Sequence, residues 1–155
     1  MTVRRFEVGD LDAVFAIQRA AYEPLYNKYR DIQTSPYTES RETLLAKYTR
    51  EGSFGYVFVE EAEIIGAVRV ALFPEDRSAR ISALAVHPDH QGRGVAQRAL
   101  AAIEVIHADA QRWFLDTIAE EAGNCHLYEK LGYVKTGKLE KINEKMTLVF
   151  YEKKR

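Results

Sequence analysis

The sequence has a single cysteine, Cys125, among 155 residues, so no disulfide bond can form within the chain. Its four histidines are spread along the chain, and with one cysteine they do not provide the ligand spacing of a structural zinc site. A chain without disulfides suits a reducing compartment. These absences lead us to expect a cytoplasmic protein that holds no metal ion.

Long apolar runs are also absent. No stretch approaches the roughly 20 residues that a membrane helix needs, and residues 1–6 lack the apolar core of a secretory signal. The formal net charge is -1, so the chain has no overall positive field that would attract nucleic acid or an anionic membrane. We therefore expect neither nucleic acid nor a membrane among its partners.

Nothing in the sequence divides the chain, because it contains no internal repeat, no low-complexity segment and no Gly/Ser-rich linker. Hydrophobic residues make up 46% and charged residues 29%, as in an ordinary soluble globular protein. A length of 155 residues is enough for one domain with a sizeable core. We therefore expect a single domain over residues 1–155.

The spacing of apolar residues predicts seven strands and four helices. The strands are expected over about residues 3–7, 56–60, 64–73, 80–86, 113–117, 133–136 and 146–151. The helices are expected over about residues 11–22, 39–50, 94–109 and 124–131. Pro24 is expected to end the first helix, because the residue before a proline disfavours the helical conformation. The order βααβββαβαββ predicts an α+β fold of mixed α/β layers with a mostly antiparallel sheet.

The most informative segment runs from Leu84 to Ala96, where a strand leads into a tight turn and the start of a helix. Gly92 and Gly94 let the backbone turn sharply and approach a ligand closely. The first amides of a helix lack partners within the helix, and the helix dipole adds partial positive charge there. This arrangement suits a phosphate or diphosphate, although a plain strand–turn–helix connection has the same pattern. The nucleotide loops GxxxxGKS/T and GxGxxG are both absent.

A second segment, Asn124 to Tyr133, predicts a short helix that stops near Gly132. Asn124 and Tyr128 are four residues apart, so they share one face of this helix. A phenol on that face can donate a hydrogen bond or a proton to a ligand. Taken alone, the same residues also fit a core tyrosine beside a helix-capping asparagine.

Together the two segments resemble the GNAT acetyltransferase family. Residues Gln91 to Ala96 are similar to its signature Q/R-x-x-G-x-G/A, with Ala96 as the final small residue. Leu84 to Pro88 resembles the family's fourth strand, and Asn124 to Tyr133 resembles its helix N-x-x-x-Y-E-K-L-G-F/Y. The resemblance implies the GNAT fold, acetyl-CoA as co-substrate, and direct attack by an acceptor amine on the acetyl group in a ternary complex. Because homodimers are common in the family, it also implies a possible homodimer.

The resemblance further implies a role for each matched residue. Backbone groups of Leu84, Ala85 and Val86 would pair with the pantetheine arm of acetyl-CoA, as an added strand pairs with a sheet edge. Asn124 would hydrogen-bond the co-substrate, and Tyr128 would donate a proton to the departing thiolate. The diphosphate would be held by backbone amides, helped by the side chains at 91 and 93, in the segment Gln91, Gly92, Arg93, Gly94, Val95 and Ala96.

The base that removes a proton from the acceptor amine has no clear match. Many members of the family have a glutamate about two residues before the position of Leu84, and this sequence has Ser82 there. A serine is a weak base, so the candidates are a water held by Ser82, or Asp116 at the end of the expected fifth strand. Asp116 also fits two other roles, which are orienting the charge of the acceptor and capping a turn.

The acceptor is expected between the first two helices and the sheet. Tyrosines and acidic residues gather in this part of the sequence, namely Tyr22, Tyr26, Tyr29, Tyr37, Glu23, Asp31 and Glu39. Simple packing of the helices would explain the tyrosines equally well. The mixture suits a small amine or a peptide amine, and the sequence does not choose between them.

Two rival functions remain open from the sequence. The first is a catalytically inactive acyl-CoA-binding module, which the missing glutamate favours and the retained Asn124 and Tyr128 oppose. The second is a small enzyme acting on nucleotide phosphates, which the absent lysine-containing loop opposes. An acetyltransferase and an acyl-CoA-binding module would both be stabilised by acetyl-CoA, and only the acetyltransferase would release free CoA thiol with an amine. A nucleotide-phosphate enzyme would instead be stabilised by ATP.

Overall fold

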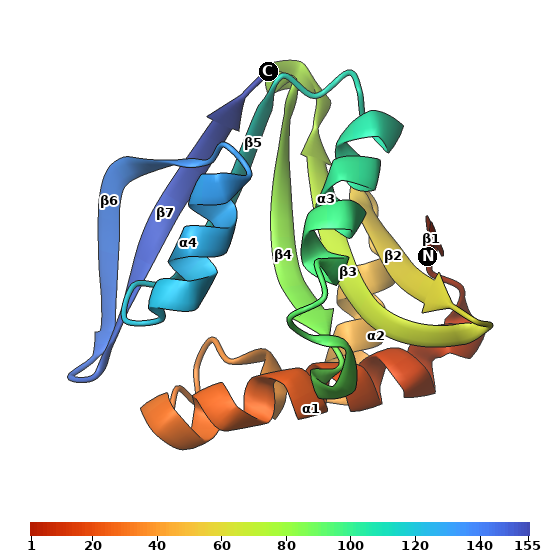
Figure 1. The fold of residues 1–155 in the computed structure, drawn as a ribbon, viewed down its shortest axis with the longest axis horizontal. Helices are drawn as coiled ribbons and strands as arrows, with labels where there is room; N and C mark the ends of the chain where they lie inside the picture. The colour runs from red at the N-terminus through yellow and green to blue at the C-terminus, as the bar shows by residue number, and fades with distance from the viewer.

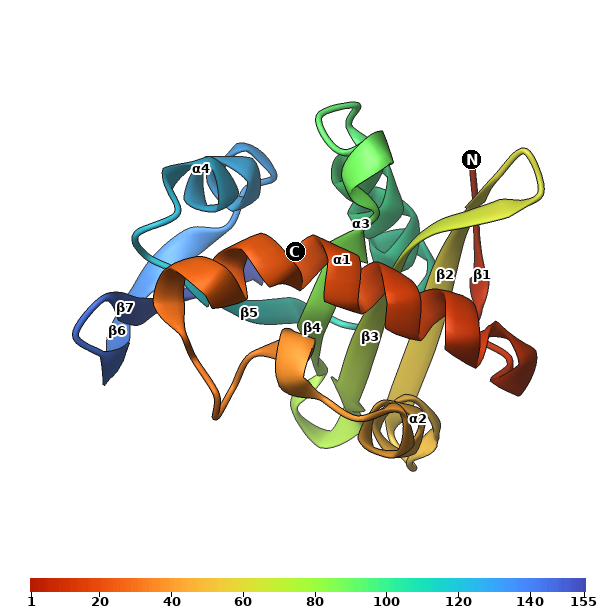
Figure 2. The same cartoon turned by 90° about the horizontal axis from the view of Figure 1, so that it is seen from below.

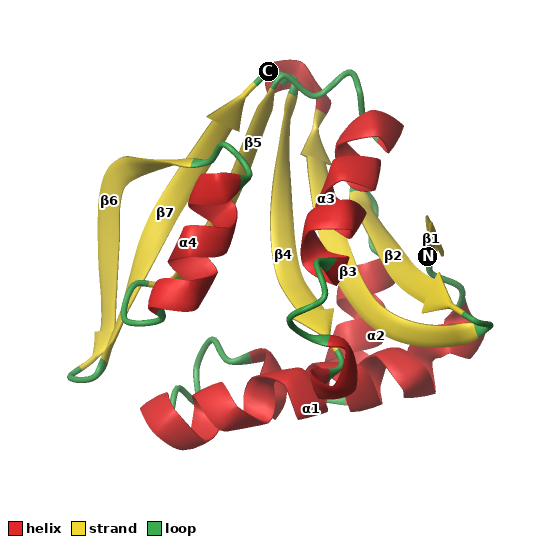
Figure 3. Ribbon diagram, viewed as in Figure 1, coloured by secondary structure: helices red, strands yellow, loops and turns green.

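The computed structural model describes residues 1–155, and a seven-stranded sheet is its framework (Figure 1). Four helices accompany the sheet, as Figure 3 shows by colour. In chain order the elements are β1 (Thr2–Arg5), α1 (Leu11–Tyr29), α2 (Arg41–Thr49), β2 (Ser53–Glu60), β3 (Glu63–Phe73), β4 (Ser78–Val86), α3 (Val95–Ile106), β5 (Arg112–Ile118), α4 (Ala122–Lys130), β6 (Val134–Asn143) and β7 (Met146–Lys154). This order confirms the predicted succession βααβββαβαββ and the mixed α+β class.

The sheet is antiparallel except at one position. The strands lie in the order β1-β2-β3-β4-β5-β7-β6, and only β4 and β5 run parallel. A parallel pair needs a crossover connection, which α3 provides here as it carries the chain from β4 to β5. The start of α3 therefore follows the end of β4, at the opposite end of this strand from the residues that pair with β5.

Helices cover both faces of the sheet (Figure 2). Helices α1 and α2 pack on one face around a small core, and α3 and α4 pack on the other around a larger one. The small core consists of Val14, Leu44, Tyr48, Val57 and Ala67. No helix in the structure is long and apolar enough to span a membrane.

The parallel strands β4 and β5 separate soon after they meet. Only Ser78–Arg80 of β4 pairs with Arg112–Phe114 of β5, whereas β5 pairs with β7 along its whole length. From Ile81 onward, β4 therefore has a strand neighbour only on its β3 side. Figure 1 shows the two strands diverging towards α1. The separation exposes backbone groups in the middle of the sheet, where they are normally paired.

A bulge bends β4 in the part that pairs with β3 but no longer with β5. Ala67 of β3 lies opposite Ala85 and Arg69 lies opposite Ser82, so the register shifts between these pairs. Within the bulge Ala83 has a φ of 52°, in the left-handed region that residues with a side chain rarely adopt. Bulges redirect backbone and side chains and often lie next to functional sites.

Pro24 does not end the first helix, contrary to the sequence prediction. It lies inside α1, which continues to Tyr29 and ends where Arg30 takes a left-handed conformation. An internal proline costs a helix about 3 kcal/mol, so contacts of the last turns must compensate. Tyr29 is buried, its carbonyl accepts a hydrogen bond from Asn143, and its hydroxyl donates one to Glu121. These tertiary contacts hold the extension in place.

The sixth strand is longer than predicted, because β6 extends to Asn143 instead of ending near residue 136. Most of its side chains are exposed on both faces, since it is an edge strand paired only with β7. Such a strand lacks the alternation of apolar and polar residues that identifies a half-buried strand. Hydrogen bonding to β7, rather than burial, therefore fixes its length.

We expect Gly66→Ala to destabilise the fold by about 1–3 kcal/mol, as overpacking of a filled core does. A Cβ atom at Gly66 would lie 2.5 Å from the ring of Phe58 and 2.7 Å from the carbonyl oxygen of Ala85. Urea unfolding followed by circular dichroism measures the change. The control is Gly9→Ala, where a Cβ atom meets nothing within 4 Å. Equal stability of the two variants would contradict the prediction.

Candidate active site

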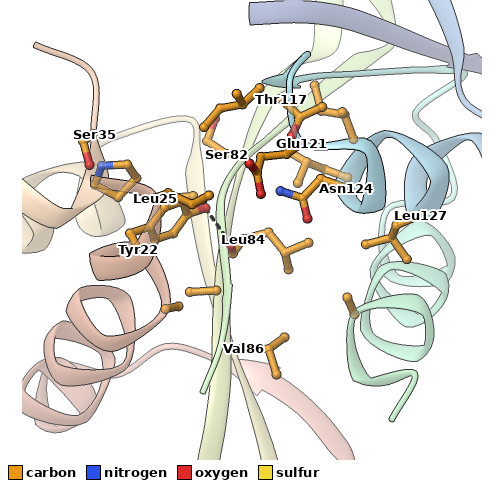
Figure 4. Close-up of a pocket in the computed structure, with 18 of the residues that line it drawn as sticks. Tyr22, Leu25, Ser35, Ser82, Leu84, Val86, Thr117, Glu121, Asn124 and Leu127 are labelled. Atoms are coloured by element: carbon orange, nitrogen blue, oxygen red, sulfur yellow. Dashed lines mark hydrogen bonds between the residues drawn. The ribbon is translucent and has the colours of Figure 1, made fainter. Parts of the chain in front are cut away.

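A cavity of about 950 Å³ opens where β4 and β5 separate (Figure 4). Its walls come mainly from α1, β4, β5, α4 and the beginning of α3, with single residues from α2 and β3 and two from β7. Binding cavities for small molecules commonly enclose about 300–1,000 Å³. All but one of the candidate residues line it, namely Ser82, Leu84, Ala85, Val86, Gln91, Gly92, Gly94, Val95, Ala96, Asp116, Asn124 and Tyr128. The exception is Arg93.

The loop before α3 presents a run of free backbone amides. Gly92 and Gly94 have φ values of 76° and 75°, which place both in the left-handed region where glycine fits without strain. No amide from Gly92 to Gln97 donates a hydrogen bond to another backbone group, and the first such donor in the helix is Arg98. Successive free amides at a helix start form a concave anion site. The loop thus has the geometry that a phosphate group requires.

Gln91 and Arg93 are placed differently from the other loop residues. The side chain of Gln91 donates a hydrogen bond of 2.9 Å to the carbonyl of Val86, and its amide donates to Pro88. Gln91 therefore ties the loop to the end of β4. Arg93 is exposed and lies outside the cavity lining, and its carbonyl accepts a hydrogen bond from Arg98. The Arg98 guanidinium therefore lies beside the loop, where it adds positive charge.

The separated part of β4 is held from the α1 side by Tyr22. The Tyr22 hydroxyl donates a hydrogen bond of 2.6 Å to the carbonyl oxygen of Leu84, next to the bulge (Figure 4). Burial raises the pKa of this phenol well above its ordinary value, so it remains a donor. Tyr22 was expected among the residues around the acceptor, and its bond to β4 could not be seen in the sequence, because 62 positions separate the partners.

Helix α4 supplies Asn124 and Tyr128 from one face, as their spacing predicted. Figure 4 shows Asn124 and Leu127 pointing across the cavity towards β4. The Tyr128 ring packs edge-on against Tyr133 at 6.1 Å, and its hydroxyl has no hydrogen-bond partner within the chain. Burial, followed by the nearby charge of Asp116, raises the pKa of the Tyr128 phenol. This phenol therefore keeps its proton at neutral and mildly alkaline pH.

The two candidate bases, Asp116 and Ser82, differ in whether a charged side chain of the protein engages them. Asp116 lies within β5, and its carboxylate is engaged by Arg80 of β4 rather than by a turn. Burial raises the pKa of Asp116, and the charge of Arg80 opposes the increase. Ser82 lies in β4 directly beside the bulge. The structure thus brings both residues to the cavity while giving the carboxylate of Asp116 a cationic partner.

One polar residue of the cavity escaped the sequence analysis. Glu121, which precedes α4, bonds to the Lys28 ammonium at 2.7 Å and to the Tyr29 hydroxyl. Burial alone would raise the pKa of Glu121, but these two hydrogen bonds outweigh it and lower the pKa. The pairing joins α1 to α4 across the cavity. No local signal could reveal it, since Lys28 and Glu121 are 93 positions apart.

The expected acceptor region lies on the α1 side of the same cavity. Among the residues expected there, Tyr22, Tyr26, Tyr29, Asp31 and Glu39 line it. Tyr37 and Glu23 do not. The Tyr37 ring instead packs edge-on against Tyr26 at 5.0 Å, so it supports the wall from behind.

Comparison with known proteins agrees with this arrangement. The acetyltransferase (GNAT) family profile matches residues 22–133. This range contains the free-amide loop, both separated strands and α4. No curated protein matches the chain in sequence.

Several solved structures share the fold at low sequence identity. The PaiA N-acetyltransferase of Thermoplasma acidophilum, solved with coenzyme A, has a TM-score of 0.81 at 16% identity, covering 99% of this chain and 98% of that one. The ribosomal-protein-S18-alanine N-acetyltransferase of Escherichia coli has a TM-score of 0.79 at 17% identity over 99% and 92%. The spermidine N-acetyltransferase of Vibrio cholerae, solved with CoA and spermine, has a TM-score of 0.77 at 23% identity over 97% and 93%.

Proposed function

The chain belongs to the acetyltransferase (GNAT) family, and from this premise we propose that it transfers an acetyl group from acetyl-CoA to a primary amine. The observation that carries the proposal is the run of unpaired amides from Gly92 to Gln97 at the mouth of the cavity. A diphosphate offers several negatively charged acceptors to such a run. Related folds with coenzyme A, from Thermoplasma acidophilum and Vibrio cholerae, support it.

The residues present fit the parts of acetyl-CoA. The loop amides suit the diphosphate, and the unpaired edge of β4 at Leu84, Ala85 and Val86 suits the amide groups of the pantetheine arm. Asn124 faces the same space from α4 (Figure 4). When bound, acetyl-CoA supplies an acetyl group already activated as a thioester.

Three groups of the chain prepare the transfer. The Tyr128 hydroxyl is protonated and free of partners within the chain, so it can donate its proton to the departing sulfur. Backbone amides of the bulged β4 can stabilise negative charge that develops on the carbonyl oxygen. Tyr22 fixes the Leu84 carbonyl, and with it the local direction of these amides.

The acceptor must lose a proton before it can attack, because an ammonium group has no lone pair. The pairing of Asp116 with Arg80 weakens it as a base and favours a water held at Ser82. With so weak a base, deprotonation depends mainly on bulk pH. A free alkyl amine has an ordinary pKa near ~10.4, so only a small fraction is neutral near pH 7.

We therefore expect kcat/KM for an alkyl amine to rise about tenfold per unit between pH 7 and 9, following the neutral amine. Tyr128 must stay protonated to act, and burial raises its pKa, so the acid form persists over this range. Initial rates of thiol release at saturating acetyl-CoA measure the profile. A profile that levels off near pH 7 would instead reveal a dedicated base with a pKa near neutrality.

The function as a whole is tested by two measurements. Calorimetry should detect acetyl-CoA binding at micromolar to millimolar concentrations and no comparable binding of ATP. A panel of amino acids, alkyl amines and peptides should then release free CoA thiol with at least one acceptor. Failure of acetyl-CoA to bind would overturn the proposal. Binding without thiol release from any acceptor would favour the inactive acyl-CoA-binding module.

A further inference from the structure

Among the lysine, arginine, aspartate and glutamate side chains of the cavity lining, Arg69 is the one whose charged group has no hydrogen-bond or ion-pair partner in the chain. It lies on β3 and lines the cavity, yet its guanidinium takes part in no hydrogen bond, ion pair or ring contact with another residue. Its main-chain position lies directly opposite Ser82, beside the bulge of β4. Residues opposite each other on neighbouring strands place their side chains on one face, roughly 5 Å apart. Arg69 and Ser82 thus share the acceptor side of the opening.

Every acid of the lining is already satisfied. Glu39 binds Lys47 at 2.6 Å and Gln18 at 3.1 Å, and Asp116 is engaged by Arg80. The remaining acids are held in the same way, Glu121 by Lys28 and Tyr29, and Asp31 by the amides of residues 33 and 34. The cavity therefore offers one guanidinium without a hydrogen-bond partner, whereas each of its carboxylates already has one.

The environment of Arg69 favours an anion at this point. Burial and then repulsion by Arg50 lower the pKa of its guanidinium, and the nearby Tyr48 and Glu39 only partly oppose this, yet an arginine remains charged at physiological pH. A partly desolvated charge without a partner is costly. The planar fork of a guanidinium binds a carboxylate through two parallel hydrogen bonds, which offsets that cost.

We propose that the acceptor is a small amino acid, whose carboxylate binds Arg69 with the Ser82 hydroxyl as a second donor while its amine faces the opening of β4. This inference rests on the proposed function and assigns its substrate class. It separates this chain from an enzyme for polyamines, because a polycation would find no free acid in the cavity and would meet the charge of Arg69.

Matched acceptor pairs test the assignment. Each pair consists of an amino acid and the amine left when its carboxylate is removed, such as lysine with cadaverine or β-alanine with ethylamine. For the amino acids that the wild-type chain acetylates best, we expect kcat/KM to exceed that of the decarboxylated partner by more than tenfold. A dipeptide with the same free amine distinguishes a small acceptor from a peptide. Equal or better turnover of the decarboxylated amines, or of the dipeptide, would overturn the proposal.

A variant then locates the preference at one residue. Arg69→Gln should raise KM for the preferred acid more than tenfold and change KM for its decarboxylated partner less than twofold, with acetyl-CoA affinity unchanged. Arg69→Lys should restore part of the preference, since it restores a charge without the planar fork. The matched control is Arg50→Gln, which removes an equal charge close by but outside the cavity lining. If the two glutamine variants behave alike, Arg69 does not bind the acceptor.

The outcomes also distinguish failure of the carboxylate site at Arg69 from failure of the proposed acetyltransferase function. If no acceptor releases thiol, the acetyltransferase function fails, and binding of the amino acids is then measured by calorimetry in the presence of CoA. Binding to the wild type that is lost in Arg69→Gln and kept in Arg50→Gln would still support a carboxylate site at Arg69. Equal binding to all three chains, or no binding to any of them, would overturn that site.

Discussion

Gly94→Asp is expected to abolish binding of acetyl-CoA, with Kd rising more than about 100-fold, because like charges brought together cost several kcal/mol. Gly94 lies immediately before α3 with a φ of 75°, in the middle of the free-amide loop. A carboxylate there would accept hydrogen bonds from the amides that the diphosphate needs, and it would repel the diphosphate. Calorimetric titration with acetyl-CoA measures the loss.

Two controls separate charge from backbone strain. Gly94→Ala keeps the loop neutral but forces a side chain into the left-handed region, which costs about 1–2 kcal/mol, and its Cβ atom would lie 3.3 Å from the mobile end of Arg98. We expect it to weaken binding far less than Gly94→Asp. Gly9→Asp adds the same charge at a distant exposed position with open space around it and should leave binding unchanged. Normal affinity in Gly94→Asp would remove the loop from the site.

The free-amide loop was predictable because its signals are local. Gly92 and Gly94 are close in sequence, they adopt the left-handed conformations that glycine allows, and α3 begins directly after them. The same holds for α4, where a spacing of four residues placed Asn124 and Tyr128 on one face. Patterns of this kind need no knowledge of the rest of the fold.

Elements governed by distant contacts were predicted less well. Pro24 has a strong local tendency to end a helix, and contacts of Tyr29 with β6 and α4 overrule it. Most side chains of the edge strand β6 are exposed, so its sequence shows no alternation of apolar and polar residues. The contacts that extend α1 past Pro24 come from residues 92 and 114 positions away. The length of β6 is set by backbone pairing with the next strand, β7, and the spacing of apolar residues reveals neither.

Several contacts of the site were also not predicted from the sequence, because they join residues that are far apart in the chain. The bond from Tyr22 to Leu84 spans 62 positions and the pairing of Asp116 with Arg80 spans 36, so both depend on the tertiary arrangement of α1, β4 and β5. Arg69 stands among alternating strand residues, where a charged side chain usually indicates a solvated face. Only the position of α1 and α2 over that face makes it part of a cavity. The acceptor side of the site is therefore a tertiary property.

Tyr128→Phe is expected to lower kcat by about 100-fold or more, in the range that loss of a general acid produces, and to change the Kd for acetyl-CoA less than about threefold. The substitution removes only the hydroxyl, which has no hydrogen-bond partner in the chain, and keeps the ring that packs against Tyr133 and Tyr151. Single-turnover release of thiol, with binding measured separately, gives both quantities. Equal turnover of the two chains would exclude Tyr128 as the acid.

A loss of turnover could also arise if the missing hydroxyl loosened the packing of α4, and Tyr133→Phe controls for this. Tyr133 contacts the same ring, and its own buried hydroxyl has no hydrogen-bond partner, so removing it should cost little. If turnover falls only in Tyr128→Phe, loosened packing is excluded as the cause, and loss of the proton donor is the explanation that remains. The pH profile then gives a second criterion, because the wild-type rate should keep rising to pH 9 only while the raised pKa of Tyr128 holds its proton in place.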